Sequence, residues 1–326
     1  IDTTDNLSYT FAPVEDGDQL RFWVQPIEEA RPSNSAPSNQ IALQARTNRP
    51  MRFVHLISLT TTAADEVEAQ WIWDDSADMQ SGSLRRDGDI VVFHSAAAQR
   101  LNTALDANAS INTQSHQYQV FTTDPCGFEV NSGIGKTVFL TATAGDNYTN
   151  QLQWSPFELD GAQVLEYQVF KSVNAQPAQR IATTTDTLYS DRLDVQQAAQ
   201  YNACYYVVAT AALTLPNQPA RYTYSRSNTA CALQNALMRL PNAFSPNGHN
   251  RTFRPAFVFP ASIAEYSMQI FDRYGKMVFE SREPLTGWDG TANGTALPQG
   301  VYIVQIRLRQ PDGTYVHEQG TVMLLR

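Results

Sequence analysis

Residues 151–172 read QLQWSPFELDGAQVLEYQVFKS, and this stretch decides the fold. Apolar and polar residues alternate on both sides of a short break, LDG, that is rich in turn formers. Alternation with a period of two, closed by turn residues, is typical of β-strands and not of helices. The stretch therefore predicts two strands joined by a turn, with Trp154 on the first strand and Tyr167 on the second.

Similar strand patterns fill the rest of the chain. Short β-branched and aromatic runs bounded by Gly, Pro, Asn or Asp recur throughout, among them MRFVHLISL, DIVVFHS, HQYQVFTTD and KTVFLTATA. The one helix-like piece is Ala-rich and runs from His94 to Ala109, where we expect a short helix or an inserted loop. The sequence thus predicts an all-β protein.

The strand patterns repeat at about the length of one sandwich domain. After residues 151–172, the runs AQRIATTTDTLYSDRL, CYYVVATA and YSRSNTACAL supply strands C′, E, F and G in order after B and C. This pattern resembles the fibronectin type III fold. In such a sandwich a large inward aromatic fills the space between sheets that lie about 10 Å apart, so we expect Trp154 and Tyr167 in the core.

Two further copies of this pattern precede it. In residues 47–142, QWIWDD fits strand B and YQVFTTDPCG fits strand F. Near the N-terminus, residues 21–24 align with residues 204–207, and residues 38–39 align with residues 227–228. We therefore expect tandem Ig-like or fibronectin type III-like β-sandwiches, and we expect the natural protein to extend upstream. The expected units are the C-terminal half of a domain at 1–46, a divergent domain at 47–142, a third at 143–236, and a separate final domain at 237–326.

Bulk composition narrows the function class. A hydrophobic share of 42% with 17% charged residues is typical of a globular chain and excludes a disordered one. The net charge of −9 disfavours binding to nucleic-acid phosphates. No run of 18 apolar residues occurs, so we expect no transmembrane helix. Residues 237–326 hold nine Lys and Arg against seven Asp and Glu, a net charge of +2, which leaves a net charge of −11 for residues 1–236. This difference supports a separate final domain.

The three cysteines indicate the redox compartment. Cys204 and Cys231 are equidistant from the centre of a turn-rich segment near residue 217, so an antiparallel hairpin would place them opposite each other, within reach of a disulfide. The alternative is two small buried residues. The bridge is our prediction, and it implies an oxidising, extracytoplasmic compartment. Cys126 is left over, and we expect it to be buried, with a partner outside this chain as the alternative.

The sequence pattern of residues 240–326 predicts another small β-domain. EYSMQIFD and KMVFES are strands joined by RYG, where Gly275 would supply the positive φ of a tight hairpin. Asn293 and Gly294 suit a type I′ turn, and PDG at 311–313 turns a long strand back on itself. Alternation along that strand places four apolar side chains on one face, namely Tyr302, Val304, Ile306 and Leu308.

The same block carries a specific resemblance. NAFSPNG with TFRP, YSMQIFDRYGKMVFES, GWDG, LPQGVYIVQI and a closing GTVMLLR occur in order at the chain's end. Together they resemble the gliding motility-associated C-terminal domain, the type B sorting domain of Bacteroidota type IX secretion substrates. The resemblance implies export to the periplasm, recognition of the folded domain by the type IX translocon and an outer-membrane shuttle or anchor protein, and secretion or display on the cell surface.

The resemblance also selects candidate residues. Most would define the fold, while Arg273 and Tyr274, at an exposed hairpin tip, are the candidates for partner docking. The positions that match the motifs are Phe244, Pro246, Asn247, Gly248, Phe271, Arg273, Tyr274, Gly275, Trp288, Asp289, Gly290, Gly300 and Tyr302. One departure concerns the first loop, which is acidic in the family and could hold a hard cation. Here it reads PNGHNRTF, with His249 and Asn250 and no carboxylate, so we expect no calcium there.

Other chemistry has weak support in the sequence. The five histidines lie far apart, and the HExxH, Gly-x-Ser-x-Gly and P-loop motifs do not occur, so we expect neither catalytic residues nor a metal or other cofactor. The densest carboxylate group comprises Asp74, Asp75, Asp78, Asp87 and Asp89; we expect a solvated turn, with a calcium site as the alternative. Trp71, Trp73 and Tyr118 could form a glycan platform, but we expect them in the core.

These observations give one leading hypothesis and two alternatives. The leading one is a non-enzymatic part of a large secreted or surface protein, in which the sandwiches act as stalk or adhesive modules toward surface glycans or other cells and the last domain directs export. The first alternative is the non-catalytic tail of a secreted hydrolase. The second is a carbohydrate-binding module.

Overall fold

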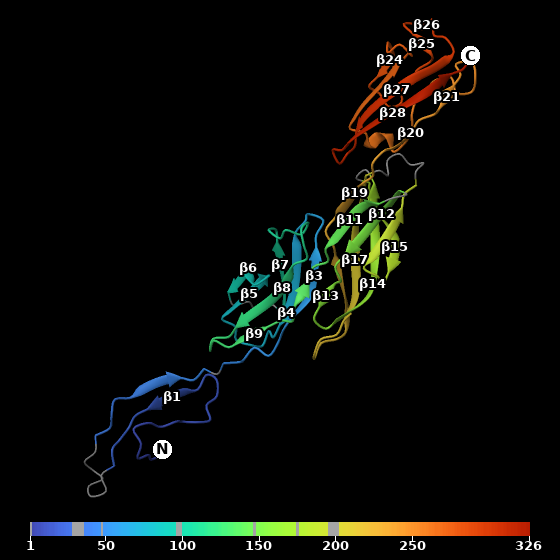
Figure 1. The fold of residues 1–326 in the computed structure, drawn as a ribbon. Helices are drawn as coiled ribbons and strands as arrows, with labels where there is room; N and C mark the ends of the chain where they lie inside the picture. Colours follow the sequence, from blue (N-terminus) through green and yellow to red (C-terminus); the bar gives the residue numbers. More distant parts are fainter. Residues whose placement is uncertain are drawn as a thin grey trace.

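The computed structural model describes residues 2–27, 36–46, 48–95, 100–145, 148–173, 176–194 and 202–326. The chain is elongated, with the N-terminal hairpin at one end, two sandwiches in the middle, and the C-terminal domain at the other end (Figure 1). The described residues contain no α-helix, and short 3-10 turns such as Pro260–Ser262 supplement the strands. The predicted all-β fold class is confirmed.

The third sandwich has the predicted strand order. Its smaller sheet has the order β11-β12-β16, and its larger sheet has the order β15-β14-β17-β18, with β19 also paired to β17. The strands are β11 (Leu140–Gly145), β12 (Thr149–Trp154), β14 (Ala162–Val173), β15 (Gln179–Thr184), β16 (Leu188–Arg192), β17 (Asn202–Leu213), β18 (Arg221–Arg226) and β19 (Ala230–Leu233). Trp154 and Tyr167 are buried with ring centroids 5.7 Å apart, as expected for aromatics that fill the space between the sheets.

The second sandwich repeats this arrangement. One sheet has the order β3-β4-β7, and the other contains β8, β5 and β6, with β9 paired to β8. The strands are β3 (Val54–Thr61), β4 (Val67–Trp73), β5 (Ser81–Arg86), β6 (Asp89–Ser95), β7 (Leu101–Asp106), β8 (Gln117–Thr123) and β9 (Glu129–Asn131). Trp71, Trp73 and Tyr118 are fully buried, so the prediction that they belong to the core is confirmed.

The prediction of a short helix or an inserted loop from His94 to Ala109 is wrong for the middle of that segment. Leu101–Asp106 is strand β7, which pairs with β4 along its length, and residues 94 and 95 end strand β6, while residues 96–99 lie outside the described part. Along β7, Ala104 and Asp106 point inward and alternate with exposed residues. Pairing with a formed sheet therefore overrides the helix preference of an Ala-rich segment.

The second and third sandwiches are packed together. Strand β10 (Gly135–Lys136) and strand β13 (Glu158–Leu159) extend the larger sheet of the second sandwich, although β13 follows the first strands of the third. Across the same junction, Thr223 Oγ1 donates to the Ile57 carbonyl at 2.9 Å, and the Arg226 N–H donates to Thr60 Oγ1 at 2.9 Å. One hydrophobic core cluster contains residues of both sandwiches. The domain boundary at 142/143 stays a prediction.

One Val–Ser hydrogen-bonding motif occurs three times in the described part of the chain. In each copy the Ser N–H donates to the Val carbonyl, the Ser Oγ accepts from the Val N–H, and the same Oγ donates to the carbonyl of the residue after the Ser. The three pairs are Val24–Ser38, Val120–Ser132 and Val207–Ser227. The first copy belongs to the hairpin of β1 (Gln19–Phe22) and β2 (Ile41–Gln44), where Arg21 faces Ala42 as Cys204 faces Cys231. This geometry supports the predicted alignment of residues 21–24 with residues 204–207.

A buried tyrosine–aspartate–cation group, which the sequence did not indicate, ties three strands together. Tyr205 donates its hydroxyl to Asp191 at 2.6 Å, and Lys171 Nζ lies 2.7 Å from the same carboxylate. Lys171 and Tyr205 are direct partners across β14 and β17. The second sandwich repeats the group with Arg86, Asp106 and Tyr118.

The terminal domain is built on a five-stranded sheet with the order β21-β28-β27-β23-β24. Its strands are β21 (Ala243–Phe244), β23 (Glu265–Phe271), β24 (Met277–Ser281), β27 (Gly300–Arg309) and β28 (Tyr315–Leu324); two small ladders add β20 (Leu237–Arg239), β22 (Ala256–Val258), β25 (Thr291–Ala292) and β26 (Thr295–Ala296). The predicted inner face of β27 is confirmed, since Tyr302, Val304, Ile306 and Leu308 are all buried. The expected turns are also confirmed, because Gly275, Asn293 and Gly294 have positive φ.

A short joint connects the third sandwich to the terminal domain. The Ala236 N–H donates to Gln310 Oε1 at 2.9 Å, and Gln310 Nε2 donates to the Ala236 carbonyl at 3.0 Å. On the other side of the joint, the rings of Tyr148 and Phe259 meet edge to face with centroids 5.8 Å apart. These contacts fix the end of β27 against the third sandwich.

Candidate functional site

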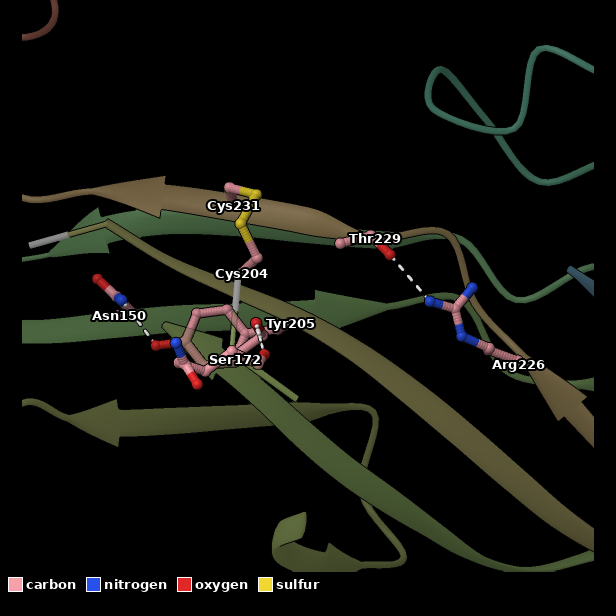
Figure 2. The surroundings of a disulfide bond; sticks show 8 residues. Asn150, Ser172, Cys204, Tyr205, Arg226, Thr229 and Cys231 are labelled. Atoms are coloured by element: carbon pink, nitrogen blue, oxygen red, sulfur yellow. Dashed lines mark hydrogen bonds between the residues drawn. A yellow bond between two sulfur atoms is a disulfide. The ribbon is translucent and has the colours of Figure 1, made fainter. Parts of the chain in front are cut away.

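The predicted disulfide is present. Cys204 on β17 and Cys231 on β19 are direct partners in the antiparallel register, and their sulfurs are bonded at 2.00 Å (Figure 2). Cys204 alternates along β17 with inward-facing Ala203 and Tyr205. The bridge therefore links β17 to β19 on the outer face of the sheet. The disulfide therefore supports the interpretation that the protein works in an oxidising compartment.

The expectation that Cys126 is buried is wrong. Cys126 is exposed in the turn between β8 and β9, where its backbone N–H donates to Asp124 Oδ1 at 2.8 Å. Its sulfur accepts from Asn48 Nδ2 at 3.4 Å. A turn of this kind points its side chains outward, which strand-like alternation of the flanking residues does not indicate.

The aromatic motif residues of the terminal domain form its core. Trp288 lies between Phe244 and Tyr302, with ring centroids 5.3 Å and 4.8 Å away, and all three side chains are buried. The Trp288 indole N–H donates to the Thr291 carbonyl at 2.8 Å, and the Tyr302 hydroxyl donates to the Pro298 carbonyl at 2.8 Å. With their polar atoms satisfied inside the domain, these residues define the fold and offer no surface.

The polar and glycine motif residues shape turns beside this core. The Gly248 N–H donates to the Ser245 carbonyl at 2.9 Å, which closes the turn that contains Pro246 and exposed Asn247. Asp289 accepts from both the N–H and the hydroxyl of Thr291. Gly290 has a φ of +81°, and a Cβ there would lie 3.0 Å from a methyl of Leu324 and 3.2 Å from Pro246. Gly300, by contrast, has open space around it and begins β27.

The remaining motif residues form an exposed hairpin tip. Asp272 Oδ1 accepts from the N–H groups of Tyr274 and Lys276 at 2.8 and 3.0 Å, and Gly275 takes a φ of +80°. Tyr274 is 83% exposed, and the Arg273 guanidinium lies 5.4 Å from the centroid of its ring. Since Asp272 holds the backbone, Arg273 and Tyr274 are displayed on a fixed turn. Phe271, at the end of β23, is partly exposed next to it.

The acidic segment of the second sandwich is more structured than a solvated turn. Asp74 is buried, accepts from Arg52 Nε at 2.6 Å, and is bonded to the Ser76 hydroxyl. The Arg52 guanidinium holds the pKa of the Asp74 carboxyl well below its ordinary value. Asp78 pairs with Arg49 at 2.8 Å. The expectation of a solvated turn is therefore wrong for Asp74, because an arginine 22 residues away neutralises it.

Over the described ranges, no group of three or more His, Cys, Asp or Glu side chains is arranged to hold a metal ion. No helix among these residues is long and apolar enough to cross a membrane.

Comparison with known families supplies the decisive observation. Residues 238–324 match the CHU_C type IX secretion signal domain family. The matched range covers the whole five-stranded sheet and every motif residue predicted for the terminal domain. A type IX secretion signal domain indicates export, followed by secretion or localisation at the cell surface.

Comparison with curated proteins found no match. Among solved structures, the chain is similar to the FN1-FN3 domains of chicken CNTN1, at 11% identity over 85% of this chain and 99% of that one, with a TM-score of 0.22. It is also similar to fibronectin(III)-like modules of Clostridium thermocellum CbhA, at 9% identity over 56% of this chain and 94% of that one, with a TM-score of 0.23. The fold assignment rests on the strand orders and registers described above.

Proposed function

We propose that residues 237–326 act as an export signal by docking, as a folded domain, onto an outer-membrane component of the type IX secretion machinery. The match to the secretion signal family carries this proposal. Its mechanism is recognition: the aromatic motif residues hold the domain rigid, and the tip at Arg273 and Tyr274 presents side chains to the partner. A shuttle or anchor protein then retains the chain on the cell surface or releases it.

The sandwiches of residues 1–46, 47–142 and 143–236 form a non-enzymatic stalk in this proposal. Support comes from the packed junction between the second and third sandwiches, the disulfide, and the hydrogen bonds between Gln310 and Ala236. Each of these stiffens the chain. A stiff rod that ends in a docking domain suits the presentation of adhesive surfaces away from the membrane.

A carbohydrate-binding role loses its sequence-predicted candidates, because Trp71, Trp73 and Tyr118 are buried. Two exposed tyrosines on β18, Tyr222 and Tyr224, lie on one face of that strand, where a sugar ring could reach them. A glycan array probed with wild-type protein and with Y222A/Y224A tests this second candidate function, which equal signals for both proteins would exclude.

Deletion in the full chain tests the proposed function. Residues 1–326 and residues 1–236, each behind a signal peptide and a fluorescent reporter, are expressed in a strain with an active type IX system. We expect the full chain outside the cells and the truncated chain in the periplasm. Export of both chains to the same extent would exclude residues 237–326 as the signal.

A further inference from the structure

The outer face of the terminal sheet is divided into an apolar half and a polar half. In the apolar half, Phe271 is the direct partner of Met277 on β24 and of Ile303 on β27, and Val301 is the direct partner of Met323 on β28. Directly opposed residues point to the same face with Cβ atoms about 5 Å apart, and residues i and i+2 on one strand share that face. These five side chains, Phe271, Met277, Val301, Ile303 and Met323, therefore form one stripe across four strands, which we call the distal stripe.

Three side chains of the distal stripe are exposed, and the other two, Phe271 and Ile303, are partly exposed. Met277, Val301 and Met323 are 47%, 49% and 36% exposed, and none of the five residues belongs to the buried core of the domain. The other half of the same face is polar, with Gln305, Arg307 and Arg309 continuing the outward positions of β27. An apolar patch that crosses four of the five strands of a sheet, beside a polar one, marks an interaction site.

The stripe lies at the free end of the molecule. Val301 is the second residue of β27, whereas Gln310, just past the other end of that strand, is held against Ala236 at the joint. Nine residues of strand span about 30 Å, so the preceding sandwich does not cover the stripe. Figure 1 shows β25 and β26, which precede β27, at the far end of the chain from the N-terminus.

The charges beside the stripe indicate what it would bind. The hairpin tip carries exposed Arg273 and Lys276, while Asp272 in the same turn is occupied by backbone N–H groups. Glu280 is the carboxylate on β24, where Gln269 Nε2 donates to it at 3.4 Å. The terminal domain has a net charge of +2, with nine Lys and Arg against seven Asp and Glu, unlike the acidic remainder of the chain.

We propose that the distal stripe and the tip cations together bind a protein component of the secretion machinery whose surface presents apolar side chains flanked by carboxylates. The proposal rests on the proposed function and names the surface that performs it. The stripe supplies desolvated contact area, and Arg273 and Lys276 steer and orient the acidic partner.

Export of full-chain variants tests the proposal. The stripe variant is V301Q/M323Q and the charge variant is R273E/K276E. The matched controls change residues that are also exposed but lie elsewhere: L165Q/L285Q for the stripe and R239E/R251E for the charges. Urea unfolding of each purified chain checks that the domain still folds. We expect both test variants to lower the exported fraction by about tenfold or more, the effect of about 1.4 kcal/mol of lost binding, and both controls to match wild type.

Each other outcome has a distinct meaning. Wild-type export of a folded V301Q/M323Q chain would overturn the stripe while leaving the proposed function intact. Failure of the unmodified chain to be exported would overturn the proposed function and this proposal with it. A dimer of the purified chain that V301Q/M323Q converts to monomer would show that the stripe binds a second copy, which also overturns the proposal.

Discussion

Gln310 binds both backbone groups of Ala236, accepting from its N–H and donating to its carbonyl, across the joint between the third sandwich and the terminal domain. Both residues are buried. Because a buried backbone group without a partner is unfavourable, this side chain fixes the position of the terminal domain relative to the third sandwich.

Replacing Gln310 by Ala should loosen this joint. The change leaves a buried N–H and a buried carbonyl without their partner, so we expect a loss of about 1–3 kcal/mol in the free energy of local opening. Faster amide hydrogen exchange at Ala236 would show it. The matched control is Q305A, which changes an exposed glutamine on β27, the strand that ends just before Gln310; equal exchange in both variants would contradict the account.

Removing the disulfide should destabilise the third sandwich. The bridge closes a loop with a sequence separation of 27 residues, and constraining the unfolded chain in this way is worth about 3.5 kcal/mol. We expect C204A/C231A to unfold at a clearly lower urea concentration than wild type. C126A, which removes an exposed free thiol, serves as the control and should unfold like wild type.

Trp288 should be essential for the terminal domain to fold. Its ring is fully buried against Phe244 and Tyr302, so W288A should lower the free energy of unfolding by about 3–5 kcal/mol. Protease resistance of the terminal domain and export should be lost together. The half-exposed Trp23 supplies the control, W23A, and a stable but unexported W288A chain would instead assign Trp288 to the docking surface.

Alkaline pH should weaken both middle sandwiches. Burial, together with the hydrogen bond to Asp106, raises the pKa of the Tyr118 phenol; burial and Asp191 do the same for Tyr205. Because the folded-state pKa is raised, the stability that these phenols contribute is complete below their ordinary pKa of about 10 and is lost as pH rises above it.

Urea midpoints at about pH 8 and about pH 11 measure this loss. We expect Y118F/Y205F to be less stable than wild type at the lower pH, because two buried carboxylates lose a donor. The same variant should lose less stability between the two pH values. An identical pH dependence in wild type and variant would exclude the tyrosines as its source.

Sequence reasoning predicted the features that depend on local pattern. Alternation along β27 identified its inner face, turn chemistry identified the positive φ of Gly275, and distance from a turn centre identified the disulfide. Each of these follows from spacing within one strand or one hairpin.

Features that depend on the register of several strands were not predicted. The tyrosine–aspartate–cation group needs residues from three strands, such as Lys171, Asp191 and Tyr205. Asp74 was misjudged because Arg52, which neutralises it, is remote in sequence. The distal stripe depends on four strands, so the sequence showed only single outward apolar residues. Strand β7 was missed because its helix preference yields to pairing with β4.

The most direct test of the central claim is transfer of the signal to a foreign protein. Residues 237–326, and separately residues 143–326, are fused behind a signal peptide and a fluorescent reporter in a type IX-competent strain and in its translocon mutant. We predict that the reporter leaves wild-type cells and stays in the periplasm of the mutant. Export of the longer fusion alone would add the third sandwich to the signal. A reporter that stays in the periplasm with both fusions would contradict the claim that the terminal domain directs export.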